Sequence, residues 1–165
     1  MIIVHENLPN EAKNIKDVCR AVFGIECRLI DQNLDDVFIP TQKFDGHLKS
    51  ILELDKYFDI LKSKVLVITA RDIYSRDISK NDDWIFGSAY RNTCVVATAR
   101  MKGFDNSPRH ILEVPTELYL RRVIAVAIHE IGHDVIKADH FKEAVWVNAL
   151  TGYRLPLGPH CTDNT

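Results

Sequence analysis

The chain has 165 residues, of which 46% are hydrophobic and 27% are charged, and its formal net charge is -2. This length and composition fit one globular domain with a sizeable core, spanning residues 1–165. The small negative charge, with no basic run longer than Arg121-Arg122, argues against nucleic acid as a partner.

The amino terminus and the cysteines indicate the compartment. Residues 1–6 show no basic segment followed by a long apolar run, so we expect no signal peptide, and no membrane span is visible. The four cysteines are widely spaced in a chain too large to need disulfide bonds for stability. We therefore expect a cytoplasmic protein with no membrane partner, whose thiols are free or metal-bound.

The first part of the chain predicts two strands and two helices. Residues 1–4 form a short apolar run suited to a buried strand. From Pro9, apolar residues recur at helical spacing as far as Phe23, and Gly24 is suited to end that helix. A second strand is expected over residues 26–31, and residues 55–61 are expected to be part of a second helix.

The middle of the chain predicts three further strands. Residues 64–70 are rich in β-branched side chains, as in a central strand, and Asp72 and Ser75 are expected in the loop that follows. Strands over 84–89 and 93–99 flank Arg91-Asn92, a short polar connection that predicts an antiparallel hairpin with Asn92 in a left-handed turn conformation. This alternation of strands and helices indicates a mixed α/β (α+β) fold, a single layered domain with a mixed sheet.

The last predicted helix carries a metal-binding motif. It begins near Thr116, and its apolar residues recur at helical spacing up to Ile131. His129 and His133 are four residues apart and therefore share one helix face, where both imidazoles can reach one ion at about 2.0–2.1 Å. Glu130 beside them is the residue type that accepts a proton from a zinc-bound water. The other interpretation is that these are two hydrogen-bonded core histidines on an otherwise apolar helix. The position of the motif on a strongly apolar helix favours metal binding.

With this motif the chain resembles the archaemetzincins, zinc metallopeptidases of the metzincin clan. The resemblance also includes residues 64–74 with the Asp72-Ile73-Tyr74 step, residues 85–89 (Ile-Phe-Gly-Ser-Ala) and residues 158–161 (Gly-Pro-His-Cys). It implies a metzincin-like fold with a zinc-binding active-site helix. The family pattern is H-E-x-x-H-x-x-G-x-x-H-C followed by further cysteines and a methionine, and it implies a catalytic zinc on three histidines and a structural zinc on four cysteines.

The chain departs from the family pattern after His133. Ile136 stands in place of the glycine and Asp139 in place of the third histidine. We expect His140, one residue later, to be the third zinc ligand, with His160 and Asp139 as the alternatives. A straight helix would carry His140 about 10 Å beyond His133, so this ligand set requires the helix to bend or end after His133.

The carboxyl terminus departs from the pattern as well. The chain ends at Thr165, one residue before the family's second cysteine would fall, so we expect that a C-terminal segment is missing. Cys161 is then a ligand of a second, structural zinc only if the full-length chain supplies further cysteines.

The resemblance implies a zinc-dependent metallopeptidase that acts on peptide or protein substrates, with Glu130 activating the zinc-bound water. Its metzincin relatives bind extended peptides along an antiparallel edge strand, and the hairpin over residues 84–100 is the candidate for that strand. The alternative is a catalytically inactive homologue that serves as a zinc-binding or protein-interaction module. The missing glycine favours that alternative, whereas the retained Glu130 favours an enzyme.

Overall fold

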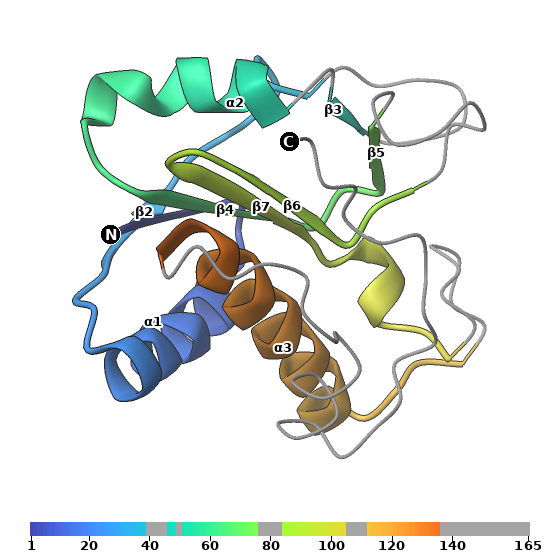
Figure 1. Cartoon of the computed structure of the whole chain (residues 1–165). Helices are drawn as coiled ribbons and strands as arrows, with labels where there is room; N and C mark the ends of the chain where they lie inside the picture. The colour runs from blue at the N-terminus through green and yellow to red at the C-terminus, as the bar shows by residue number, and fades with distance from the viewer. Residues whose placement is uncertain (39–45, 49–50, 76–83, 105–111, 136–165) are drawn as a thin grey trace.

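The computed structural model of the chain describes residues 1–38, 46–48, 51–75, 84–104 and 112–135, arranged around one five-stranded sheet (Figure 1). The α-helices are α1 (Pro9–Phe23), α2 (Ile51–Phe58) and α3 (Thr116–Val135). The strands are β1 (Ile2–His5), β2 (Arg28–Asp31), β3 (Gly46–Leu48), β4 (Val65–Thr69), β5 (Ile73–Ser75), β6 (Gly87–Tyr90) and β7 (Thr93–Ala97). Two short 3-10 helices, η1 (Asp59–Leu61) and η2 (Ala99–Met101), follow α2 and β7.

The main sheet is mixed, in the order β2-β1-β4-β7-β6. Strands β2, β1, β4 and β7 are parallel, and β6 pairs antiparallel with β7 at the end of the sheet. Strands β3 and β5 form a separate parallel pair. The prediction of a mixed α/β fold with a mixed sheet is therefore confirmed.

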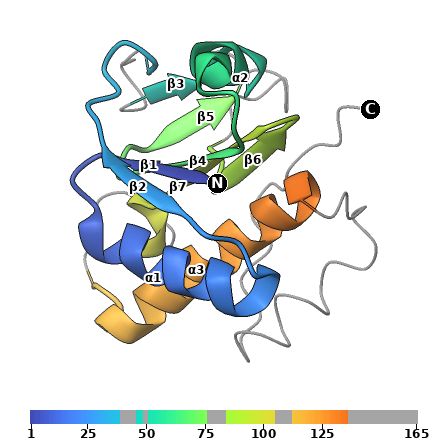
Figure 2. The ribbon, with the colours of Figure 1, turned by 90° about the vertical axis from the view of Figure 1, so that its left-hand side faces the viewer.

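Helices cover both faces of this sheet. Figure 2 shows α1 and α3 side by side on one face, with α2 on the opposite face. Every residue of β4 and β7 is buried, as expected for parallel strands rich in β-branched side chains between two helical layers. Two apolar cores result, one between the sheet and the α1/α3 layer and the other beneath α2.

Helix α1 matches its sequence prediction at both ends. Pro9 occupies the first turn, where its missing N–H costs no hydrogen bond. Gly24 ends the helix with φ +66° and donates its N–H to Arg20 O at 3.1 Å. This left-handed conformation carries a steric cost for most other residues, which explains a glycine at this position.

Three local predictions need correction. Ser75 lies in β5 rather than in a loop, because the segment after β4 pairs with β3. Helix α2 begins at Ile51, and the predicted helical residues after Phe58 form the tighter η1 turn. In the β6–β7 turn the left-handed residue is Arg91, with φ +50°, and not Asn92.

The turn between β6 and β7 is fixed from the α2 layer. The Asp55 carboxylate of α2 accepts a hydrogen bond from Asn92 N–H at 3.3 Å and another from Thr93 Oγ1 at 3.1 Å. Because Asp55 is itself buried, these hydrogen bonds satisfy a carboxylate that would otherwise be costly to bury.

The described cysteines and helices bear on two further predictions. Within the described part of the chain, Cys19, Cys27 and Cys94 are buried and not disulfide-bonded, and burial raises the pKa of Cys19 to about 12, well away from that of a reactive thiolate. No helix in the described part of the chain combines the length and apolar character needed to cross a bilayer.

Candidate metal centre

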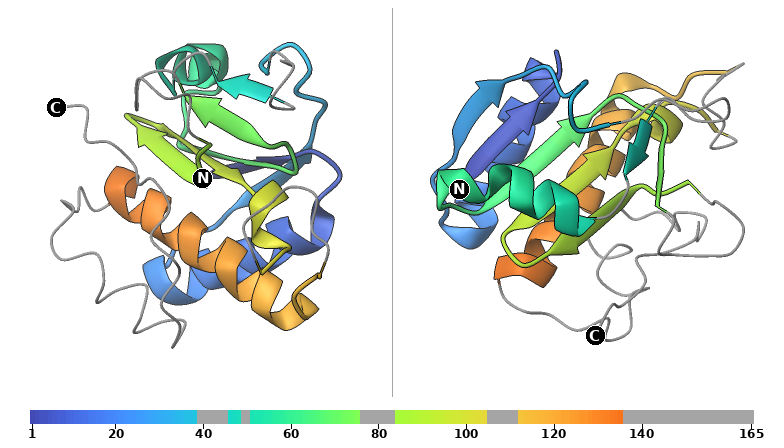
Figure 3. Two further views of the ribbon diagram at one scale, coloured as in Figure 1. Left: turned by 90° about the vertical axis from the view of Figure 1, so that its right-hand side faces the viewer. Right: turned by 90° about the horizontal axis from the view of Figure 1, so that it is seen from above.

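Helix α3 is fixed to the rest of the molecule along its length. Near its amino end, Arg122 donates from Nη1 to Met101 O at 3.0 Å and to Gly103 O at 2.8 Å, and burial lowers the pKa of Arg122. Further along, the Cys94 thiol of β7 donates to Glu130 O at 3.3 Å. These contacts, with the apolar packing beneath the helix, fix α3 against the sheet (Figure 3).

The two motif histidines converge on the carboxyl-terminal part of α3. The Nε2 atoms of His129 and His133 lie 3.0 Å apart, and the two half-buried rings are nearly perpendicular, at 87°. Two nitrogen ligands of a tetrahedral zinc ion, each about 2.0–2.1 Å from the metal, are about 3.3–3.4 Å apart. The pair therefore fits one zinc ion after a movement of a few tenths of an ångström.

Glu130 lies on the side of α3 that faces the edge strand β6. Its side chain is only 1% exposed. A Cβ atom placed on Gly87, the first residue of β6, would lie 2.5 Å from Glu130 Oε1 and 2.9 Å from both Cδ and Cγ. The carboxylate thus lies directly against the backbone of the edge strand, one residue from His129 on the helix.

The other predicted ligands lie outside the described residues. These are His140, Asp139, His160 and Cys161, so the predictions of a third catalytic ligand and of a structural zinc remain predictions. Among the residues that the structure describes, no group of three or more His, Cys, Asp or Glu side chains is arranged to hold a metal ion. Within this part of the chain the site therefore consists of a histidine pair and the neighbouring glutamate.

A second polar cluster, which the sequence analysis did not predict, lies at the carboxyl ends of the parallel strands. Arg71 donates from Nε and Nη2 to the two oxygens of Glu6, at 3.0 and 2.6 Å, and also to Asp35 Oδ1. Glu6 further accepts from Thr69 Oγ1 and Leu34 N–H. Hydrogen bonding to Arg71 lowers the pKa of Asp35, and hydrogen bonding to Glu6 raises the pKa of Arg71. Because opposite charges pair within it, this strand-end cluster has a structural role.

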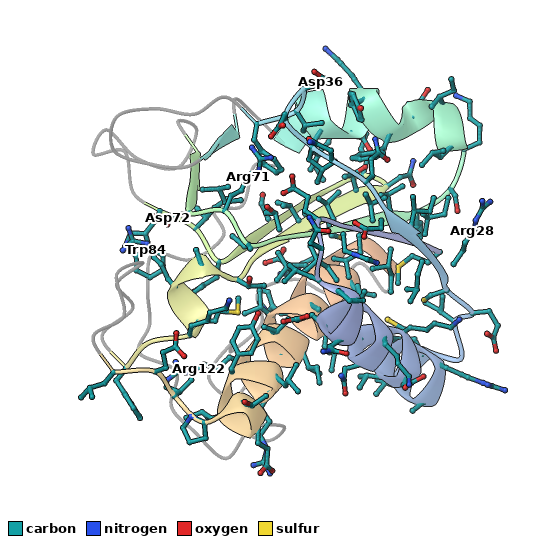
Figure 4. All side chains as sticks on the ribbon, turned by 180° about the vertical axis from the view of Figure 1, so that it is seen from behind. Arg28, Asp36, Arg71, Asp72, Trp84 and Arg122 are labelled. Atoms are coloured by element: carbon teal, nitrogen blue, oxygen red, sulfur yellow. The ribbon has the colours of Figure 1, made fainter. Side chains whose placement is uncertain are left out.

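The segment leading into β6 is held by a second ion pair. Arg100 makes a bidentate pair with the buried Asp72, at 2.7 and 2.9 Å, and its guanidinium lies 4.8 Å from the centre of the Trp84 ring. Figure 4 shows Asp72 and Trp84 close together on the same side of the molecule as Arg71. Asp72, which the resemblance singled out, therefore contributes to fixing the start of the hairpin.

The chain is similar to known proteins in structure, although its sequence matches none of the family models or curated proteins. Among solved structures, the archaemetzincin of Archaeoglobus fulgidus, complexed with malonate, superposes with a TM-score of 0.58 at 20% identity, covering 89% of this chain and 85% of that one.

Two further structures are similar. The archaemetzincin of Methanopyrus kandleri has a TM-score of 0.52 at 20% identity, covering 80% of this chain and 70% of that one. A zinc-dependent peptidase of Methanocorpusculum labreanum has a TM-score of 0.51 at 17% identity, covering 80% and 78% respectively. At 17–20% identity, these three structures show that the chain shares the fold of the two archaemetzincins and of the zinc-dependent peptidase.

Proposed function

We propose that the chain is a zinc-dependent metallopeptidase that hydrolyses peptide bonds in peptide or protein substrates. The observation that carries this proposal is the 3.0 Å approach of His129 Nε2 to His133 Nε2, with the Glu130 carboxylate one residue away along the helix. The three similar structures, two archaemetzincins and a zinc-dependent peptidase, support the same reaction class.

The donor set suits zinc. Imidazole nitrogens are among its preferred ligands, and a catalytic zinc commonly has three protein ligands with one position left open. His129 and His133 are the first two ligands, and we propose His140 as the third, with His160 and Asp139 as alternatives. Cys161 is proposed as a ligand of a second, structural zinc if the full-length chain supplies further cysteines.

The proposed hydrolysis needs a metal ion and a proton acceptor. When bound, zinc supplies Lewis-acid polarisation of the scissile carbonyl and lowers the pKa of water. Glu130 accepts a proton from the attacking water and delivers it to the leaving amine. Glu130 is only 1% exposed, and its packing against Gly87 of β6 limits the positions that its carboxylate can take.

Strand β6 supplies a surface for the substrate. It is the last strand in the order of the described sheet, pairs with β7 along one edge and contacts α3. Its other edge faces away from β7. An extended peptide can add to such an edge through backbone hydrogen bonds, which bind many sequences with little side-chain preference. Glu130 lies against the first residue of this strand, so a peptide bound there lies near the proposed base.

The first test measures zinc content and peptide cleavage together. Purified protein is assayed for zinc by mass spectrometry and for cleavage of a mixed peptide library, alongside His129→Ala, Glu130→Gln and Glu117→Gln. We expect at least one zinc per wild-type chain, loss of the catalytic ion in His129→Ala, and a cleavage rate about 10²–10⁴-fold lower in Glu130→Gln with zinc retained.

Glu117→Gln is the matched control, because Glu117 lies on the same helix but is exposed and, among the described residues, forms an ion pair with Arg121. It is expected to keep both zinc and activity. Zinc binding without cleavage in the wild-type chain would support the inactive, zinc-binding alternative instead. Absence of bound zinc from the 165-residue chain, and from a longer form if one exists, would contradict the metallopeptidase proposal.

The same assays identify the third ligand. His140→Ala, His160→Ala and Asp139→Ala are compared, and we expect only His140→Ala to lose the catalytic zinc. Loss with His160→Ala or Asp139→Ala alone would assign the third position to that residue.

A further inference from the structure

Gly87 and Glu130 approach more closely than a residue with a side chain at position 87 allows. A Cβ atom on Gly87 would lie within 3.0 Å of three Glu130 side-chain atoms, Oε1, Cδ and Cγ, a separation that real Cβ atoms essentially never show. The conflict involves the body of the Glu130 side chain as well as its tip. A small rotation of the carboxylate alone therefore does not relieve it.

The backbones on both sides of this contact are held in place. Strand β6 is paired with β7 over four residues, from Gly87 opposite Val96 to Tyr90 opposite Thr93. Helix α3 is anchored by Arg122 and by the Cys94 hydrogen bond to Glu130 O. Because both backbones are held, a methyl group added at Gly87 has to displace the Glu130 side chain that it would meet.

We propose that Gly87 is a positioning residue for peptide hydrolysis: its lack of a side chain leaves the space that the Glu130 carboxylate occupies. The inference rests on the proposed function, because it treats Glu130 as the general base. Gly87 itself contacts neither the metal nor the reacting atoms. It acts through the position of the carboxylate, and a displacement of about 1 Å in such a group can lower a rate by about 100-fold.

The test begins with Gly87→Ala in the full chain. We expect kcat for a cleavable peptide to fall by about 10- to 100-fold while KM and the zinc content stay at the wild-type level. A general disturbance of the helix would instead release zinc, because His129 and His133 lie on the same turn as Glu130. A wild-type kcat in Gly87→Ala, with zinc bound, would overturn the proposal.

A double-mutant cycle tests the contact without depending on activity. Glu130→Ala removes all three atoms that the added Cβ would meet. We expect Gly87→Ala to lower the melting temperature by several degrees in the wild-type background, and by much less in the Glu130→Ala background. An equal loss in both backgrounds would overturn the proposal.

Gly132→Ala is the control for the cycle, because a Cβ on Gly132 meets no described atom within 4 Å. It is expected to show the same change in melting temperature with and without Glu130. If Gly87→Ala alone fails to fold, folding of the Gly87→Ala/Glu130→Ala chain supports the proposal, and failure of both chains contradicts it. Coupling in the cycle without any peptide cleavage by the wild-type chain would reject the proposed function while leaving the contact established.

Discussion

Two polar groups in the described part of the molecule, the strand-end cluster and the histidine pair of α3, differ in how their side chains interact. In the strand-end cluster, the Arg71 guanidinium lies between the carboxylates of Glu6 and Asp35, so donors meet acceptors and opposite charges pair. On α3, two groups of the same kind turn toward each other, with His129 Nε2 and His133 Nε2 3.0 Å apart. Two imidazole nitrogens can share at most one proton, whereas both can donate a lone pair to one cation.

Under the proposed function, this difference separates a structural cluster from a metal-binding one. In the strand-end cluster, both carboxylates accept hydrogen bonds from the one guanidinium of Arg71. The histidine pair offers two lone-pair donors to the same point, which is the arrangement that a metal ion requires. Removal of side chains from the first cluster should therefore affect folding, and removal from the second should affect metal binding.

The largest expected effect on stability is that of Arg71→Met, which keeps most of the stem and removes the charge. The side chains of Arg71 and Glu6 are 18% and 13% exposed, so the variant leaves a largely buried carboxylate without its counter-charge. We expect a loss of about 3 kcal/mol in the free energy of unfolding, measured by urea denaturation, with unchanged zinc content.

Arg20→Met is the control for Arg71→Met. Its ion pair with Glu26 is exposed at both side chains, 74% and 72%, and such pairs contribute less than about 1 kcal/mol. Equal losses in the two variants would show that the strand-end cluster adds no more stability than a surface pair does.

A slightly smaller effect is expected from His133→Ala, and only when zinc is present. At a free zinc concentration 100-fold above its dissociation constant, binding should raise the free energy of unfolding of the wild-type chain by about 2.7 kcal/mol. The variant should lose this increment, because one of the two converging nitrogens is gone. Unfolding measured with zinc and with a chelator gives both values. An undiminished zinc increment in His133→Ala would remove the distinction between the clusters.

The smallest expected effect is a pH dependence of the strand-end cluster. The pKa of Asp35 is lowered in the folded protein, by its hydrogen bond to Arg71 first and by Asn33 second. Asp35 therefore stabilises the fold above the pKa of an unfolded aspartate, about 3.9, and this contribution is lost as the pH falls through the folded value.

Asp35→Asn tests the sign of this effect. The variant should have a lower urea midpoint than the wild type at pH 6, and the difference should shrink as the pH falls through the lowered folded pKa of Asp35, where the aspartate becomes protonated and neutral like the asparagine. A difference independent of pH would show that the Asp35 charge contributes nothing to the fold.

The sequence predicted most of the elements because their signals are local. Pro9 and Gly24 mark both ends of α1, and the β-branched run over 64–70 contains β4. The spacing of His129 and His133 placed both rings on one helix face, where the structure has them. Each of these predictions depends on residues within a few turns of one another along the chain.

The features that the sequence did not predict depend on distant residues. Arg71 lies 65 positions from Glu6, and only the parallel pairing of β1 with β4 brings them together. The contact between Gly87 and Glu130 likewise requires the edge strand and α3 to be placed first. Residue preference predicted Asn92 as the left-handed residue of the β6–β7 turn, but Arg91 has that conformation. With Arg91 left-handed, Asn92 N–H and Thr93 Oγ1 both donate to the Asp55 carboxylate.

The β6–β7 hairpin is held at both of its ends. Asp55 fixes the turn from the α2 layer, and the Asp72–Arg100 pair with the Trp84 ring fixes the segment that enters β6. In the described part of the sheet, β6 has β7 on one side only. Under the proposed function, a hairpin restrained at two points loses little conformational entropy when a substrate peptide pairs with β6, so the cost of ordering falls mainly on the peptide and favours substrates that are already extended.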